Sequence, residues 1–428
     1  MWTKLLRVLS DLKSNRVLKG AISLIMGSAI AKGIGLAVMP ILTRMYSAED
    51  FGRLSLFVSV TTIAASLLTF RYVVALPIPS SRIRARHLLL LSVTLGAITA
   101  VLIGLVLAIA VYVFGQGSAD GFWRAYWWLV IVGAIGAAGY ELATMWATRR
   151  QQYHAISTSQ VWQMLSGSAT KLVGGFFGLG SVGLILGQVM QQSGGLAGLA
   201  RPMLSSLRRA LKEFNGRYLL AVAARYSDFP KYKMPAHFVY AYAAQAPVIM
   251  ASYLWGASST GQLGLAFQSM ALPISLISQN ASRVYYAELS KIGRGNPSAA
   301  LELTRYMGVR LFGVGSLLGI GIFALAPMLF SLVFGQAWTE AGELARAMAI
   351  FIPFQFVASP LIMAYNIYGD QRRVLITHFI RAALVSMVFV LSYFLGLSLL
   401  KTIYIYAVVI SVHYLLICRN VVKEISAS

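Results

Sequence analysis

The chain has 428 residues, of which 58% are hydrophobic and only 11% are charged, and its mean hydropathy is +0.72. A soluble protein of this length needs more polar surface than that composition supplies, so a soluble fold is excluded. The net charge of +23 does not indicate a nucleic-acid partner. The lysines and arginines lie mostly in short connections between apolar blocks, where the positive-inside rule of membrane proteins places them.

Apolar blocks long enough to cross a hydrocarbon core of about 30 Å recur along the whole chain. We therefore predict an all-α, polytopic membrane protein with twelve transmembrane helices. The predicted spans are residues 20–43, 51–77, 88–114, 122–147, 155–177, 180–200, 235–255, 261–287, 308–333, 343–367, 374–396 and 400–418.

Charge placement predicts the orientation of these spans. Every second connection is basic, whereas the intervening connections hold only Arg44, Arg124 and Lys401. This asymmetry places the basic connections and both chain ends in the cytoplasm. The longest connection, 201–234, carries eight basic residues. Its stretch LSSLRRALKEFNGRYLLAVA is predicted to form an amphipathic helix on the anionic inner leaflet, which makes anionic membrane lipids expected partners.

The same connection divides the chain into three parts. They are an N-terminal six-helix bundle (1–200), a basic cytoplasmic linker (201–234) and a C-terminal six-helix bundle (235–428). The halves share a weak repeat: SAEDFGRLSL at 47–56 aligns with GASSTGQLGL at 256–265, and Gly52 matches Gly261. Because each half has an even number of spans, a duplication of this kind predicts two pseudo-symmetric bundles around a central cavity.

Ionisable residues inside the predicted spans are mostly basic, and Glu141 is the clearest acid among them. An anionic guest would neutralise such an excess, so a cationic cavity is predicted. Lys32 lies near mid-membrane, where a charge is costly, and the cavity is favoured for it. The other candidates lie nearer to span ends, where snorkelling to the interface explains them equally well. The candidate cavity cations are Lys32, Arg71, Lys171, Arg283 and Arg381.

Polar side chains recur at helical spacing along several spans. Stripes of serine and threonine commonly hold helices together. Glutamines on the same stripes as cations favour a wet path, and the candidates for it are Gln160, Gln163, Gln245, Gln268, Gln279 and Asn366. Pro247 is the candidate hinge for a change of access, although a static kink explains it equally well.

No constellation of residues in the sequence indicates catalysis. The five histidines are scattered, Cys418 is the only cysteine, and no nucleotide-binding loop of the GxxxxGK[ST] kind occurs. We therefore expect no catalytic residues, no metal, no cofactor and no ATPase activity.

Three stretches carry a resemblance to a known family: PILTRMYSAEDFGRLSLF (40–57), FRYVVALPIP (70–79) and YSDFPKYKMP (226–235). They resemble bacterial polysaccharide-unit flippases, which share a superfamily with multidrug exporters of the toxic-compound extrusion type and the lipid II flippase. Such proteins often carry an acid after RY, where this chain has Val73. Any role of that acid therefore does not carry over.

The resemblance implies two six-helix bundles around a central cavity in the bacterial inner membrane. It also implies a substrate, an oligosaccharide repeat unit of an O-antigen or exopolysaccharide on an undecaprenyl-pyrophosphate carrier, moved from the inner to the outer leaflet. Arg225, Lys231 and Lys233 are then expected at the cytoplasmic mouth. Other polysaccharide assembly proteins become expected partners.

Alternating access by such a flippase is the function that we predict, and alternatives remain. A multidrug exporter of the same superfamily would favour an acidic cavity for organic cations. A membrane polysaccharide polymerase or ligase would need outward-facing catalytic groups, usually on a sizeable external loop. A passive assembly scaffold would not need a charged interior.

Overall fold

The structure is a computed structural model that describes residues 16–114, 122–369 and 371–427. The described residues form helices and turns, and no strand occurs among them. Eight helical segments in the part of the chain that the structure describes are long and apolar enough to cross a membrane. A helix suits this setting, because a backbone in lipid must satisfy its hydrogen bonds within the segment. The predicted all-α, polytopic membrane fold is confirmed. The basic N-terminal segment, 1–15, lies outside the described residues.

The chain divides into two compact units. The first comprises residues 1–42 and 60–234, and the second comprises 43–59 and 235–428. The predicted bundle boundaries at 200 and 235 stay a prediction. The helix α3 (Ala48–Leu68) contributes its first half to the second unit and its second half to the first.

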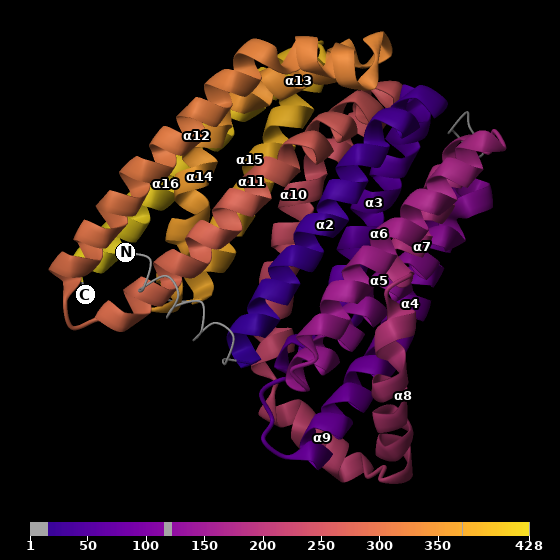
Figure 1. Ribbon diagram of the computed structural model, residues 1–428, viewed down its shortest axis with the longest axis vertical. Helices are drawn as coiled ribbons and strands as arrows, with labels where there is room; N and C mark the ends of the chain where they lie inside the picture. The colour runs from indigo at the N-terminus through magenta and orange to yellow at the C-terminus, as the bar shows by residue number, and fades with distance from the viewer. Residues whose placement is uncertain (1–15, 115–121, 370, 428) are drawn as a thin grey trace, which may run out of the picture. The chain divides into compact units, whose positions relative to one another are not determined.

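The first unit is built from helices, of which Figure 1 labels the α-helices. Besides the end of α3 they are α2 (Arg16–Met45), η1 (Tyr72–Ala75), α4 (Arg82–Phe114), α5 (Phe122–Arg149), α6 (Tyr153–Phe176), α7 (Gly180–Ser193), α8 (Leu196–Lys212), α9 (Gly216–Arg225) and η3 (Phe229–Lys233).

The second unit contains the remaining helices. They are α10 (Met234–Leu254), α11 (Gly256–Ile292), α12 (Pro297–Phe334), η4 (Gln336–Trp338), α13 (Thr339–Met348), η5 (Ala349–Phe351), α14 (Ile352–Leu361), η6 (Ile362–Asn366), α15 (Gln371–Phe394) and α16 (Leu399–Ser426). The predicted tenth span, 343–367, largely coincides with one helical segment, Gln336–Asn366, that is long and apolar enough to cross a membrane. Its winding changes at η5, and Pro353 follows in the first turn of α14, a position that proline favours.

The two copies of the sequence repeat meet within the second unit. A Cβ added at Gly52 on α3 would lie 1.8 Å from the backbone oxygen of Ala257, and one added at Gly261 on α11 would lie 1.8 Å from the oxygen of Ala48. Each glycine thus faces the backbone of the opposite copy. Only a residue without a side chain allows two helices to approach this closely. The repeat therefore marks the place where α3 and α11 pack backbone to backbone.

The predicted second span, 51–77, extends beyond the helix that forms there. α3 ends at Leu68, and Phe70 and Arg71 have φ angles of +47° and +59°, a region that residues other than glycine rarely adopt. Beyond η1, Pro77 and Pro79 lack the backbone N–H that a helix needs. The guanidinium of Arg149 on α5 binds the backbone oxygens of Leu76 and Pro77 at 3.3 and 3.4 Å. Arg71 consequently lies in a turn and not inside a helix.

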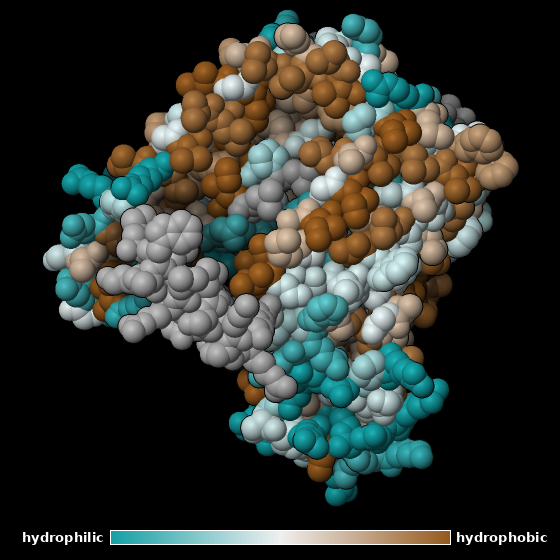
Figure 2. Space-filling view, viewed as in Figure 1, coloured by the Kyte–Doolittle hydropathy of each residue, from teal (hydrophilic) through white to brown (hydrophobic). Residues whose placement is uncertain are grey.

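The single amphipathic helix predicted at 204–223 is also wrong, because the chain forms two helices there. α8 ends at Lys212, and Asn215 caps α9 by accepting a hydrogen bond from the Tyr218 backbone N–H at 3.1 Å. Leu199, Met203 and Val222 are buried in one hydrophobic core with residues of α4 and α5. Part of the apolar surface of α8 and α9 is therefore covered by protein, whereas Leu204, Leu211, Phe214 and Leu220 are exposed. Figure 2 also shows hydrophilic residues over α8 and α9. Contact with anionic lipids stays a prediction.

Candidate functional site

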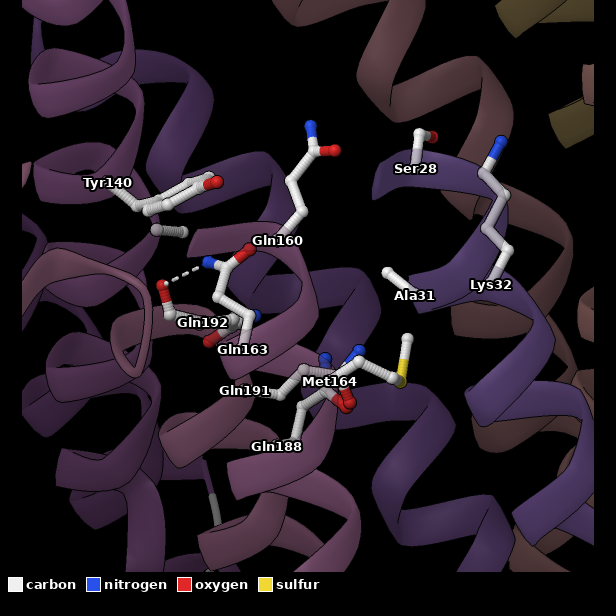
Figure 3. A pocket seen from close by; sticks show the side chains of 11 residues that line it. Ser28, Ala31, Lys32, Tyr140, Gln160, Gln163, Met164, Gln188, Gln191 and Gln192 are labelled. Carbon is white, nitrogen blue, oxygen red and sulfur yellow. Dashed lines mark hydrogen bonds between the residues drawn. The ribbon is translucent and has the colours of Figure 1, made fainter. Parts of the chain in front are cut away.

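A polar pocket of about 350 Å³ lies within the first unit. Figure 3 shows Ser28, Ala31 and Lys32 on α2 opposite a group of glutamines on α6 and α7. Ala137 and Tyr140 of α5 complete the lining. The glutamines and the methionine among the lining residues are Gln160, Gln163, Met164, Gln188, Gln191 and Gln192. The pocket thus combines one lysine with five carboxamides, and no carboxylate belongs to its lining.

Two glycines determine how α6 and α7 form one wall of this pocket. A Cβ at Gly167 would lie 2.9 Å from the backbone oxygen of Gly187, and one at Gly187 would lie 2.9 Å from the oxygen of Gly167. The two helices therefore touch through their backbones. A third position, Gly178, has a φ of +66° in the turn that joins them. This close antiparallel pair aligns the polar residues of both helices on one side.

The close packing places the ammonium of Lys171 beside the glutamines of α7. The side chain is 8% exposed, and Nζ donates to the Oε1 atoms of Gln188 and Gln191 at 2.8 and 2.9 Å. A buried ammonium needs such acceptors, because an unsatisfied charge in the interior is costly. Since Lys171 binds the oxygen of each carboxamide, the Nε2 groups remain as donors for other partners.

Other side chains in the pocket are held by their neighbours. Gln163 Nε2 donates to the backbone oxygen of Gln192 at 3.3 Å (Figure 3). The hydroxyls of Tyr140 and Ser159 lie 2.9 Å apart. These bonds fix the orientation of the α5 and α6 side chains before any ligand enters, which reduces the entropic cost of binding.

Two carboxamide oxygens in the pocket have no hydrogen-bond partner. They are Oε1 of Gln160 and Oε1 of Gln192, and both are inaccessible to solvent. A buried acceptor without a donor costs free energy, and neither oxygen is open to the pocket. The pocket itself offers the Nε2 groups of Gln188 and Gln191 as donors and, at Lys32, one cation for an anionic group.

The structure brings together some of the candidates from the sequence. Lys32, Gln160 and Gln163 line the pocket, and Lys171 lies beside it. Arg71 belongs to the same unit, where its guanidinium forms a 2.9 Å ion pair with Glu141 on α5. The expectation that the acids leave the intramembrane cations unpaired therefore does not hold for Arg71.

The remaining candidates lie elsewhere in the two units. On α11, Gln268, Gln279 and Arg283 are exposed. Gln245 Oε1 accepts from the Ser59 hydroxyl at 3.0 Å, and Pro247 is buried in α10. The other positions are Asn366 at the end of η6, Arg225 at the end of α9, Lys231 and Lys233 in η3, and Arg381 within α15. The roles predicted for all of these residues stay predictions.

Sequence reasoning missed the α7 side of the pocket. Gln188, Gln191 and Gln192 follow the spacing i, i+3, i+4 within an apolar helix, which places them on one face. Three carboxamides within five residues of a predicted span were a signal that could have identified them. Tyr140 gave no such signal, because a tyrosine in an apolar helix is common.

Solved structures of membrane transporters share this fold. The lipid II flippase MurJ in an inward closed conformation aligns with a TM-score of 0.67 and 13% identity over 95% of this chain and 87% of that one. An inward-facing multidrug resistance transporter of the MATE family and MOP superfamily aligns at 0.60 and 16%, over 94% and 95%. The MATE transporter VcmN of Vibrio cholerae aligns at 0.58 and 13%, over 96% of each chain.

These alignments show the fold: the chain is a multi-pass membrane protein whose helical fold is shared with solved transporters, among them members of the MOP superfamily. A comparison with curated proteins finds no match. Residues 41–343 match the family model described as polysaccharide biosynthesis protein. The chain belongs to this family, and the resemblance found in the sequence is confirmed.

Proposed function

We propose that this protein is a flippase that moves undecaprenyl-pyrophosphate-linked oligosaccharide repeat units from the inner to the outer leaflet of the bacterial inner membrane. The proposal rests on one observation, the carboxamide-rich pocket beside Lys32. Family membership supports a role in polysaccharide biosynthesis, and the fold is one found in a lipid flippase and in exporters.

The chemistry of the pocket suits a saccharide. The Nε2 groups of Gln188 and Gln191 can donate to the oxygens of a sugar. Lys32 supplies a cation for a phosphate of the carrier. In this proposal the cation holds the pyrophosphate, the carboxamides bind the sugars, and the lipid tail stays in the bilayer while the access side changes.

A multidrug exporter is the second candidate, because several of the similar structures are multidrug transporters. Organic cations would require a negative counter-charge, and the pocket lining contains Lys32 and no carboxylate. Charge therefore favours an anionic or neutral polar guest. The polymerase or ligase alternative has no feature of the pocket in its favour.

Transport by the purified protein in liposomes tests the proposal. Lipid-linked oligosaccharide is placed in one leaflet, and its appearance in the other is measured by accessibility to a lectin or a sugar oxidant. We expect transfer well above that of empty liposomes. Wild-type protein that is correctly inserted but gives no transfer, while it moves a fluorescent organic cation, would establish the exporter instead.

Lys32→Gln tests the pocket itself. We expect transfer at least about tenfold slower, because a charge-assisted hydrogen bond to an anion is worth roughly 1.5–3 kcal/mol. Lys401→Gln is the matched control, since Lys401 lies in the first turn of α16, is exposed and belongs to the other unit. Equal rates for wild type and Lys32→Gln would remove the lysine from the substrate path.

A further inference from the structure

Arg381 belongs to the second unit, is partly exposed and has no carboxylate partner among the residues that the structure describes. It follows Gln371, the first residue of α15, by ten residues and precedes the last, Phe394, by thirteen. At 1.5 Å per residue these offsets are roughly 15 and 20 Å. The guanidinium thus lies near the middle of the helix, where snorkelling is least effective and an uncompensated charge is costly.

Aromatic rings surround the guanidinium. Its Cζ lies 5.7 Å from the centroid of the Tyr414 ring on α16, and Tyr240 of α10 and Tyr406 of α16 lie beside it. Tyr406 and Tyr414 are 2% and 5% exposed. A ring face stabilises a cation only partly. Arg381 Nε is inaccessible to solvent and has no hydrogen-bond partner.

Two histidines, His378 and His413, lie near Arg381. His378 precedes Arg381 by one helical turn on α15, and its ring lies 5.0 Å from that of Tyr240 in an edge-on contact. His413 of α16 is 4% exposed and lies beside both His378 and Arg381. All of these side chains carry N–H or O–H donors, and Arg381 adds a full positive charge.

The described acids of this unit are engaged or exposed elsewhere. Glu424 pairs with Arg373, Glu343 with Arg346, Glu288 with Lys291 and Glu49 with Arg53. Asp50 accepts from the Ser47 hydroxyl at 2.8 Å, and Glu302 and Glu340 are exposed. A guanidinium near the middle of a membrane helix is costly without a counter-charge. An anion would supply that charge and accept hydrogen bonds from the donors around Arg381.

We propose that Arg381, with His378, His413 and Tyr414, binds a small monovalent anion of the chloride class between α10, α15 and α16. One negative charge balances the guanidinium, and the anion accepts from the terminal N–H groups of Arg381 and from the neighbouring donors. This site belongs to the second unit and is independent of the pocket beside Lys32. In this proposal Arg381 binds an ion and does not contact the glycan.

Binding of radioactive chloride to the purified full-length protein tests the proposal. The protein is exchanged into sodium gluconate at constant ionic strength, chloride is titrated, and thermal unfolding is followed in parallel. We expect saturable binding near one ion per chain and a chloride-dependent rise in the unfolding temperature, because a ligand that binds only the folded state stabilises it. Wild-type protein that shows neither overturns the proposal, whatever the variants do.

Arg381→Gln should weaken chloride binding at least about tenfold, as expected when a charged hydrogen-bond donor is lost. Arg310→Gln is the matched control, because Arg310 is an exposed arginine within a long helix of the same unit, and it should bind as wild type does. Tyr414→Phe keeps the ring, loses the hydroxyl and should bind more weakly than wild type.

Two outcomes would contradict the proposal even if an anion binds. Equal chloride affinity in Arg381→Gln and wild type would place the ion elsewhere. Arg381-dependent binding of inorganic pyrophosphate without any binding of chloride would assign the arginine to the carrier phosphates, as the sequence alone suggests.

Discussion

Lys171 illustrates how a single charge is accommodated inside the first unit. Its ammonium is buried and bonded to the Oε1 atoms of Gln188 and Gln191, and its pairing with these carboxamides orients them. The ammonium of Lys171 therefore acts on the pocket only through these two carboxamides, whose Nε2 groups are donors. Lys32, by contrast, lines the pocket directly. Two lysines that look alike in the sequence thus have different environments.

Substitution of Lys171 by methionine tests this arrangement. The two glutamine oxygens lose their donor, and a buried unsatisfied acceptor costs roughly 1–3 kcal/mol. We expect Lys171→Met to lower the unfolding temperature measured by tryptophan fluorescence in detergent. Lys401→Met, at an exposed position, is the control and should change little.

A second substitution measures the coupling between the lysine and its partner. In the Lys171→Met background, Gln191→Leu should cost less stability than it does in wild type, because its partner is already absent. Strictly additive effects of the two substitutions would show that the hydrogen bond contributes nothing to stability.

At the scale of elements, close helix contacts depend on glycines. Gly52 and Gly261 let α3 and α11 meet backbone to backbone, and Ser55 lies against Gly264 one turn further along. Neighbouring side chains reinforce this region of the second unit. The rings of Phe51 and Trp338 meet edge-on at 5.0 Å, and Gln262 Nε2 donates to the backbone oxygen of Ala337 at 2.8 Å.

Gly261→Ala should therefore be strongly destabilising. The new Cβ would lie 1.8 Å from a backbone oxygen, which cannot rotate away, so the helices must separate at a cost of about 1–3 kcal/mol or more. The measurement is the unfolding temperature together with the yield of monodisperse protein. Gly313→Ala on α12 is the control, because no atom lies within 4 Å of its added Cβ. A normal unfolding temperature for Gly261→Ala would contradict the contact.

Helix ends show where local sequence and tertiary packing compete. Asn215 interrupts the amphipathic pattern at 204–223 and caps α9, and Asn followed by Gly216 is a turn signal visible in the sequence. Asparagine is among the best residues at this position. The pattern of apolar residues predicted one amphipathic helix on the inner leaflet. It did not reveal that part of the apolar surface is covered by α4 and α5.

At the scale of the whole molecule, the proposed cargo makes transport sensitive to voltage. Outward movement of about two net negative charges across the full membrane field gains roughly 4–5 kcal/mol at 100 mV, with the inside negative. The proteins of similar fold are transporters, and the proposed cycle needs no ATP.

A potential imposed on proteoliposomes should therefore shift the distribution of the lipid-linked oligosaccharide. We expect its fraction in the outer leaflet to rise when a potassium diffusion potential makes the interior negative, and to return when an ionophore dissipates it. An uncharged lipid-linked analogue is the control for general effects of voltage. If the fraction in the outer leaflet does not change with the potential, the carrier charge is balanced by co-moved ions or the cargo is neutral.

The sequence by itself determined the class of fold. In lipid every backbone hydrogen bond must be satisfied within a segment, so the lengths of apolar blocks are enough to predict helices and their approximate positions. The sequence also identified Lys32, Gln160 and Gln163, because polar residues in lipid-spanning helices are costly and stand out. The repeat at Gly52 and Gly261 was visible as well.

Only the tertiary structure decided which of these residues meet. The pocket draws on α2, α5, α6 and α7, and their mutual positions depend on contacts such as Gly167 against Gly187, which no helical period encodes. The structure likewise shows that Arg71 lies in a turn and forms an ion pair with Glu141. It also shows that Arg381 lies among tyrosines. Helical periodicity assigns a residue to a face of its own helix, whereas the neighbour of that face is set by packing between segments distant in the chain.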